Sequence, residues 1–154
     1  MKKIISHTAE QTLDLGKQIG QMAQPPFSIA LKGDLGAGKT TLVQGLAKGL
    51  GIDDRYYITS PTFNIINEYP ANAVRLCHLD LYRLGSADEL EHIGFDDIRG
   101  PDAIIVVEWP GFLEELAFAF DLEIKFEFDA DYNRVISLLP SGHAGINLVS
   151  NLIL

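Results

Sequence analysis

The stretch Gly33-Asp34-Leu35-Gly36-Ala37-Gly38-Lys39-Thr40-Thr41 matches the phosphate-binding pattern G-x-x-x-x-G-K-[ST] in full. The apolar, strand-like residues 27–31 precede it, and residues 42–50 follow with apolar side chains at helical spacing. A strand, a glycine-rich loop and an amphipathic helix in this order indicate a phosphate-binding loop rather than an ordinary glycine-rich turn. The sequence therefore predicts that the nine residues of this loop surround a bound nucleotide.

The residue types of the loop suit this chemistry. Glycines let the backbone turn tightly and point its N–H groups at phosphate oxygens, with the positive end of the next helix behind them. Lys39 is expected to reach the β- and γ-phosphates, and the Thr40 hydroxyl is expected to bind Mg²⁺. We therefore predict a magnesium nucleotide as the ligand.

Length and composition favour one domain spanning residues 1–154. The chain is long enough to bury a core, and its 47% hydrophobic content is that of an ordinary globular protein. A single cysteine, Cys77, excludes an internal disulfide framework and favours a reducing compartment. The sequence has neither a signal-peptide pattern nor an apolar run of membrane-spanning length, so we expect a cytoplasmic protein.

The charge of the chain argues against direct nucleic-acid binding. The formal net charge is −9, and the arginines are scattered along the sequence rather than clustered. Affinity for RNA or DNA depends largely on clustered Lys and Arg that neutralise phosphates. We expect the chain alone to bind nucleic acid weakly, although a nucleic acid can still be the substrate of an assembly that contains it.

Apolar patterning predicts alternating helices and strands around the loop. A capping box at residues 8–11 begins a helix that ends near Met22. Further strands are expected at residues 63–69, 73–80, 103–108, 122–128 and 134–139, and further helices at 39–50, 86–93 and 111–119. The tail 143–154 has helical spacing, with a strand as the alternative. The expected fold class is α/β, a single-domain P-loop NTPase with a mixed, largely parallel central sheet flanked by helices.

Two acidic residues are candidates for the metal and water chemistry. A magnesium nucleotide needs an acidic residue near Thr40, normally at the carboxyl end of a neighbouring apolar strand. Asp80 ends the strand at 74–79, and Glu108 ends the strand at 104–107. The spacing leaves open which of the two binds Mg²⁺ and which orients the attacking water.

Four further residues, Thr62, His78, Arg83 and Trp109, allow both a functional and a purely structural interpretation. Thr62 lies after the loop's helix, where many P-loop proteins sense the γ-phosphate, but taken alone its Ser-Pro-Thr segment favours a simple proline turn. His78 shares a strand face with Asp80, yet a packed strand histidine is the simpler interpretation. Trp109 fits core packing at the sheet edge, and Arg83 fits either a charge-stabilising role or an exposed position.

Five motifs taken together resemble the bacterial TsaE family, also called YjeE, over about residues 8–139. They are GDLGAGKTT at 33–41, SPTF at 60–63, HLDLYRL at 78–84, ELE and IG within 89–94, and VEWP at 107–110. Thousands of proteins share the first motif, whereas the combination of the others is highly specific. The family is the ATPase component of tRNA threonylcarbamoyladenosine biosynthesis.

The resemblance implies a P-loop α/β fold that binds ATP with Mg²⁺ and hydrolyses it slowly alone. It implies action with TsaB and TsaD, which transfer a threonylcarbamoyl group to the adenosine beside the tRNA anticodon, so that tRNA is met only through the complex. On this pattern Thr40 and Glu108 contact Mg²⁺, and Asp80 lies beside the phosphates and the attacking water. Lys39 and a switch-like Thr62 complete the expected catalytic set.

The resemblance also implies residues around this centre. His78, Tyr82, Arg83 and Trp109 are expected to serve activity or partner contact. Thr8, Tyr132 and Arg134 fall where the family closes over the adenosine. The chain departs from the family at residues 111–121, at Gln44, where a basic residue is common, and past residue 140.

Other nucleotide-binding functions are less well supported. A small-molecule kinase would use the same loop but normally needs an arginine-bearing lid, which the scattered arginines do not suggest. A nucleotide-sensing module that does not hydrolyse its nucleotide is a third hypothesis. The two acidic candidates, Asp80 and Glu108, argue against it. A guanine-specific switch is disfavoured because the sequence contains no Asn-Lys-x-Asp run.

Overall fold

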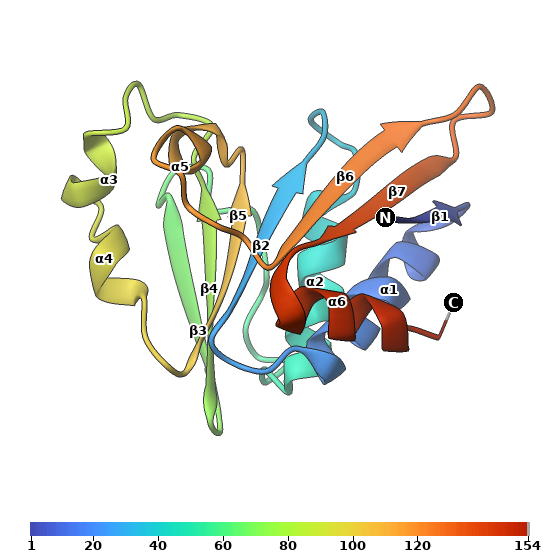
Figure 1. Ribbon diagram of the computed structural model, residues 1–154, viewed down its shortest axis with the longest axis horizontal. Coiled ribbons are helices and arrows are strands. Elements are labelled where there is room, and N and C mark those ends of the chain that lie inside the picture. The colour runs from blue at the N-terminus through green and yellow to red at the C-terminus, as the bar shows by residue number, and fades with distance from the viewer. Residues whose placement is uncertain (154) are drawn as a thin grey trace.

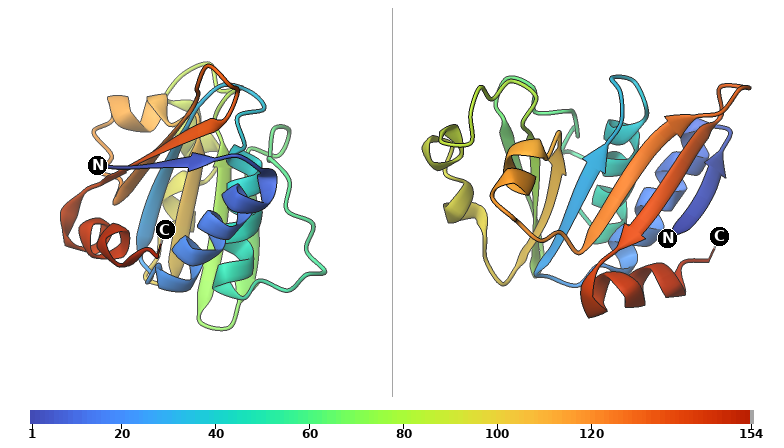
Figure 2. Two further views of the ribbon diagram at one scale, coloured as in Figure 1. Left: turned by 90° about the vertical axis from the view of Figure 1, so that its right-hand side faces the viewer. Right: turned by 45° about the horizontal axis from the view of Figure 1, so that its top comes forward.

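The apolar segments assemble into one sheet with helices on both faces (Figures 1 and 2), and the structure, a computed structural model, describes residues 1–153. The strands are β1 (Lys2–Ser6), β2 (Phe27–Lys32), β3 (Ile66–Ala71), β4 (Val74–Asp80), β5 (Ala103–Glu108), β6 (Leu122–Phe128) and β7 (Arg134–Pro140). The helices are α1 (Ala9–Met22), α2 (Lys39–Leu50), α3 (Glu89–His92), α4 (Phe95–Ile98), α5 (Gly111–Glu115) and α6 (Gly142–Asn151). None of these helices is long and apolar enough to cross a membrane.

The strand order is β1-β7-β6-β2-β5-β4-β3. Three central pairings, β6 with β2, β2 with β5 and β5 with β4, are parallel. The three outer pairings, β1 with β7, β7 with β6 and β4 with β3, are antiparallel. This confirms the predicted α/β class and the mixed sheet, whose parallel part is confined to its centre because both predicted hairpins lie at the flanks.

Strand β5 is buried on both faces, as its unbroken apolar run predicts. Ile104 and Val106 belong to the core under α1 and α2. Ile105 and Val107 belong to a second core, to which α3, α4 and α5 contribute. The parallel register places the carboxyl ends of β2, β4 and β5 at one edge, where Asp80 lies opposite Glu108. That edge is where α/β sheets bind ligands.

Helices α1 and α2 approach each other at their backbones. A Cβ atom added at Gly16 would lie 2.1 Å from the Leu42 carbonyl oxygen, and one added at Gly45 would lie 2.0 Å from the Leu13 carbonyl oxygen. Only glycine therefore fits at these two positions. Because α2 begins at Lys39, this contact fixes the phosphate-loop helix against the rest of the fold.

Several predicted boundaries are wrong for local reasons. The strand predicted from residue 63 begins at Ile66, because the preceding residues form a turn that ends with Ile65 at φ 67°. The helix predicted to residue 119 ends at Glu115, and Ala117 then turns with φ 57°. The helix predicted from residue 86 begins at Glu89, and its N-cap residue, Asp88, forms no side-chain hydrogen bond with the helix.

Two predictions near the ends of the chain are confirmed, and two elements of the structure were not predicted. Thr8 caps α1 as predicted by accepting a hydrogen bond from the backbone N–H of Gln11. The tail is helical, as its spacing favours. Strand β1 and the short helix α4 were not predicted.

Candidate nucleotide-binding site

The phosphate loop lies between the carboxyl end of β2 and the first turn of α2. Gly36 and Gly38 have φ angles of 79° and 109°, a left-handed backbone that favours glycine. At Gly38 an added Cβ would also lie 2.9 Å from Nε of Arg134. The Arg134 Nε donates a hydrogen bond to the carbonyl of Ala37 at 2.9 Å, so this arginine supports the loop from β7.

A cavity of about 400 Å³ opens beside the loop. It brings together residues from the loop, from the segment before β3, and from the ends of β4, β5 and β7. Of the predicted site residues it is lined by Leu35, Gly36, Gly38, Lys39, Thr40, Thr41, Thr62, Asp80, Tyr82, Arg83, Glu108, Trp109 and Arg134, and Ser60 joins them.

Other predicted residues lie outside the cavity wall. Gly33, Asp34 and Ala37 belong to the loop but do not line the cavity, and His78 is fully buried. Thr8 and Tyr132 also do not line it, and the Tyr132 side chain is 83% exposed on the β6–β7 turn. Their roles stay predictions.

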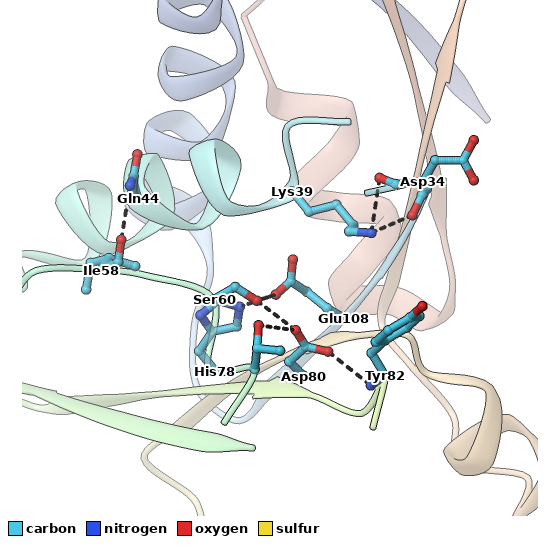
Figure 3. Close-up of polar contacts among 11 residues, drawn as sticks. Asp34, Lys39, Gln44, Ile58, Ser60, His78, Asp80, Tyr82 and Glu108 are labelled. Carbon is cyan, nitrogen blue, oxygen red and sulfur yellow. Dashed lines mark hydrogen bonds and ion pairs between the residues drawn. The ribbon is translucent and has the colours of Figure 1, made fainter. Parts of the chain in front are cut away.

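Lys39 is folded back onto its own loop (Figure 3). Its Nζ donates hydrogen bonds to the carbonyls of Gly33 and Asp34 and lies 4.2 Å from the centre of the Trp109 ring. Burial lowers the pKa of Lys39, and the charges of Glu108 and Asp80 offset part of that effect. The ammonium group is thus held by backbone carbonyls. Phosphate oxygens would be stronger acceptors for it.

Asp80 and Glu108 are both almost completely buried, with 5% and 2% of their surface exposed. The Ser60 hydroxyl lies 2.7 Å from Oδ2 of Asp80 and 2.8 Å from Oε2 of Glu108 (Figure 3). A hydroxyl has one proton and donates to one of them at a time. Asp80 also accepts from the backbone N–H of Tyr82 at 3.0 Å and from the Thr62 hydroxyl at 3.4 Å.

His78 lies behind Glu108. Its Nε2 is 3.1 Å from Oε2 of Glu108, whereas its buried Nδ1 has no hydrogen-bond partner among the described residues. Burial raises the pKa of Glu108, but hydrogen bonds from His78 and Ser60 and the charge of Lys39 outweigh it, so that the pKa is lowered overall. Glu108 is therefore held as a carboxylate, pointing into the cavity.

The donor set fits Mg²⁺. Hydroxyl and carboxylate oxygens are the ligands that Mg²⁺ takes, and the cavity carries the Thr40 hydroxyl with the carboxylates of Asp80 and Glu108. No group of three or more His, Cys, Asp or Glu side chains in residues 1–153 could hold a metal ion. A magnesium ion here would therefore need oxygens from phosphate and water, which is how nucleotide sites bind it.

The aromatic neighbours of the cavity come from two predicted positions. Trp109 has a φ of 57°, its ring faces the Lys39 ammonium group, and the ring centre lies 5.0 Å from that of Tyr82. The Arg83 guanidinium stacks on Phe63 at 4.3 Å, so the charge of this arginine is directed at the segment before β3.

Sequence reasoning missed Ser60 as an individual site residue. The residue stands in the Ser-Pro-Thr motif, but its link to two strand ends depends on how the segment folds back. Gln44 of α2 anchors that segment by donating a hydrogen bond to the Ile58 carbonyl at 3.0 Å (Figure 3). Gln44, at which the sequence predicts a departure from the family pattern, therefore has a structural role.

Comparison with known proteins gives one consistent result. The family described as "Threonylcarbamoyl adenosine biosynthesis protein TsaE" matches residues 6–136. The tRNA threonylcarbamoyladenosine biosynthesis protein TsaE of Aquifex aeolicus is 39% identical over 138 residues, covering 90% of this chain and 96% of the relative. The Bacillus subtilis protein of the same name is 37% identical over 134 residues, covering 87% and 82%. The crystal structure of Bacillus subtilis YdiB superposes with a TM-score of 0.73 at 32% identity, covering 97% of this chain and 91% of that one.

Proposed function

Because the chain belongs to the TsaE family of tRNA threonylcarbamoyladenosine biosynthesis, we propose that it is the subunit that binds and hydrolyses ATP with Mg²⁺ for that modification. It acts with TsaB and TsaD in the cytoplasm and meets tRNA only through them. The observation that carries the proposal is the pair Asp80 and Glu108, buried at two parallel strand ends and facing the loop of Lys39 and Thr40.

ATP binding uses the chain's own donors. The backbone N–H groups of the loop and the N-terminus of α2 hold the phosphates, since a helix N-terminus is a favourable site for anions. Lys39 leaves the carbonyls of Gly33 and Asp34 for the β- and γ-phosphates, which are stronger acceptors. Thr62, whose hydroxyl lies 3.4 Å from Oδ2 of Asp80, meets the γ-phosphate.

Hydrolysis needs charge stabilisation and an oriented water. Thr40 and Glu108 would hold Mg²⁺, directly or through water, and the ion supplies positive charge to the phosphate oxygens. Asp80 orients the attacking water beside it. His78 keeps Glu108 in place, and Trp109 shields the Lys39 ammonium group from solvent.

The partnership rests on the family and on the charge of the chain. A net charge of −9 disfavours direct binding of tRNA, so the partners hold the tRNA while this subunit supplies the nucleotide cycle. The test is multiple-turnover threonylcarbamoylation of tRNA by purified TsaB and TsaD with ATP, with and without this chain.

Modification that stalls without the chain and continues with it supports the proposal. If the chain hydrolyses ATP but leaves modification unchanged, the coupling is wrong, and a screen for phosphorylated acceptors tests the kinase alternative. Chains with Lys39→Ala serve as the matched control, because their phosphate loop cannot engage the nucleotide normally.

A further inference from the structure

A second cavity, of about 510 Å³, lies on the face of the sheet opposite α1 and α2. We call it the α3–α5 groove, because α3, α4 and the segment from α5 to β6 form its walls. Its floor is apolar, with Leu90, Phe95 and Leu113 buried beneath it. Leu116 stands at its side with 60% of its surface exposed. The groove therefore combines an apolar floor and one exposed leucine with polar walls on one face of the fold.

The rim of the groove carries strong negative charge. Asp88, Glu91 and Asp96 line it, and Arg99 is its single basic residue. Among the described residues neither Asp88 nor Glu91 forms an ion pair, whereas Arg99 lies 3.8 Å from Asp96 and faces the rings of Phe95 and Phe118. The two free carboxylates are therefore available to an external cation.

The charge of the whole chain gathers on this part of the sequence. Residues 85–121 contain ten of the 21 acidic residues and one of the 12 basic residues, so the remaining residues contain eleven of each. The net charge of −9 thus falls entirely within the segment that includes α3, α4, β5 and α5 (Figure 1). Part of this charge is neutralised from outside the segment, because Glu114 pairs with Lys32 and Asp102 pairs with Arg75. The unpaired Asp88 and Glu91 at the groove keep a negative field, which attracts basic surfaces and repels nucleic acid and anionic membranes.

We propose that the α3–α5 groove binds a basic amphipathic segment of the TsaB–TsaD partner complex. An apolar side chain of that segment packs onto the floor beside Leu116, and its Lys or Arg side chains face Asp88 and Glu91. This inference rests on the proposed function, which supplies the partner. Helix α5, which forms one wall of the groove, begins two residues after Trp109 of the nucleotide cavity.

The experiment measures the affinity of purified TsaB–TsaD complex for the chain with ATP and Mg²⁺ at a series of salt concentrations. The rim variant is Asp88→Lys/Glu91→Lys. Its matched control, Glu10→Lys/Asp14→Lys, reverses two exposed charges on α1 and changes the net charge by the same amount. Leu116→Ser tests the floor, with Ile146→Ser as its control on the exposed face of α6. Melting temperature and the slow hydrolysis of ATP by the chain alone verify that each variant is folded.

The wild-type affinity is expected to fall as salt rises, because salt screens the exposed charges. The rim variant is expected to lose about tenfold or more in affinity at low salt and most of the salt dependence, and the α1 control less than about twofold. Equal affinity of the rim variant and the wild type, or equal loss in the rim variant and the α1 control, overturns the groove while leaving the proposed function intact. Absence of binding by the wild-type chain overturns the partnership and the groove together.

Discussion

Asp80 and Glu108 lie opposite each other at the ends of two parallel strands and share one hydroxyl group, that of Ser60. Two buried carboxylates within hydrogen-bonding distance of the same hydroxyl repel each other. The single hydroxyl proton can be donated to only one of them at a time. The arrangement is stable because Lys39, His78 and the backbone around Tyr82 add positive or donor groups. A cation between the carboxylates would remove the remaining repulsion.

Substitution of the charged site residues is expected to separate binding from hydrolysis. Lys39→Ala weakens ATP binding, whereas Asp80→Ala and Glu108→Ala mainly abolish hydrolysis, because each removes about 2–4 kcal/mol of transition-state stabilisation. That corresponds to a loss of about 30- to 1,000-fold in the hydrolysis rate within the partner complex. Titration calorimetry measures the binding, and phosphate release measures the rate. Normal hydrolysis by both carboxylate variants would show that the metal and water assignments are wrong.

Removing the shared hydroxyl tests the relationship between the two carboxylates. Ser60→Ala is expected to destabilise the metal-free protein by about 1–3 kcal/mol, because buried acceptors lose their donor. ATP with Mg²⁺ should then raise the melting temperature of Ser60→Ala more than that of the wild type, since the cation satisfies the same oxygens. Ser60→Thr keeps the hydroxyl and should behave like the wild type. Equal ligand-induced shifts in Ser60→Ala and the wild type would contradict this account.

The close approach of α1 and α2 makes a strong prediction for stability. Gly45→Ala is expected to reduce the free energy of unfolding by about 3 kcal/mol or more, because the new methyl group would meet the Leu13 carbonyl at 2.0 Å and the helices must separate. Gly111→Ala is the control, since an added Cβ there meets nothing within 4 Å. Urea unfolding measures both. A Gly45→Ala protein as stable as the control would mean that the helices can move apart freely.

The buried thiol predicts a loss of stability at alkaline pH. Burial raises the pKa of Cys77 from 9.0 to about 11, although the charge of Arg75 opposes the shift. The unfolded thiol therefore loses its proton first as pH rises, so stability contributed by the neutral thiol is present below pH 9 and is lost between pH 9 and 11. The loss amounts to about 2–3 kcal/mol.

The measurement compares the unfolding free energy of the wild type and of Cys77→Ala from pH 8 to 11. The alanine variant has no thiol to titrate, so its profile should be flatter by this amount, whatever constant offset its smaller side chain causes. Parallel profiles across this range would rule out the raised pKa.

The parts of the fold that could be predicted are those fixed by local pattern. The phosphate loop is a motif of consecutive residues, so it can be identified directly in the sequence. Asp80 and Glu108 can be identified because each follows an apolar strand. Strand β1 was missed because its partner, β7, lies at the other end of the chain, and its short alternating pattern has no meaning without that partner. The link from Ser60 to two strand ends was missed for the same reason.

The glycines of α1 and α2 show a different gap. Glycine within a helix is unfavourable for the isolated helix, so propensity alone disfavours Gly16 and Gly45 at these positions. The close contact between the two backbones explains both, and it becomes visible only when the helices are placed side by side. The predicted start of β3 and the predicted end of α5 were wrong near Ile65 and Ala117. These non-glycine residues adopt left-handed backbone angles that no sequence pattern indicates.

Trp109 touches the Lys39 ammonium group with its ring and leads directly into α5 with its backbone. A shift of α5 on docking that moved Trp109 would change its contact with the lysine, and departure of the lysine toward phosphate would leave the ring against Tyr82 alone. The two equilibria then obey thermodynamic reciprocity: if ATP raises the affinity of the chain for its partner by some factor, the partner raises the affinity for ATP by the same factor. A single indole side chain would make nucleotide and partner into each other's effectors.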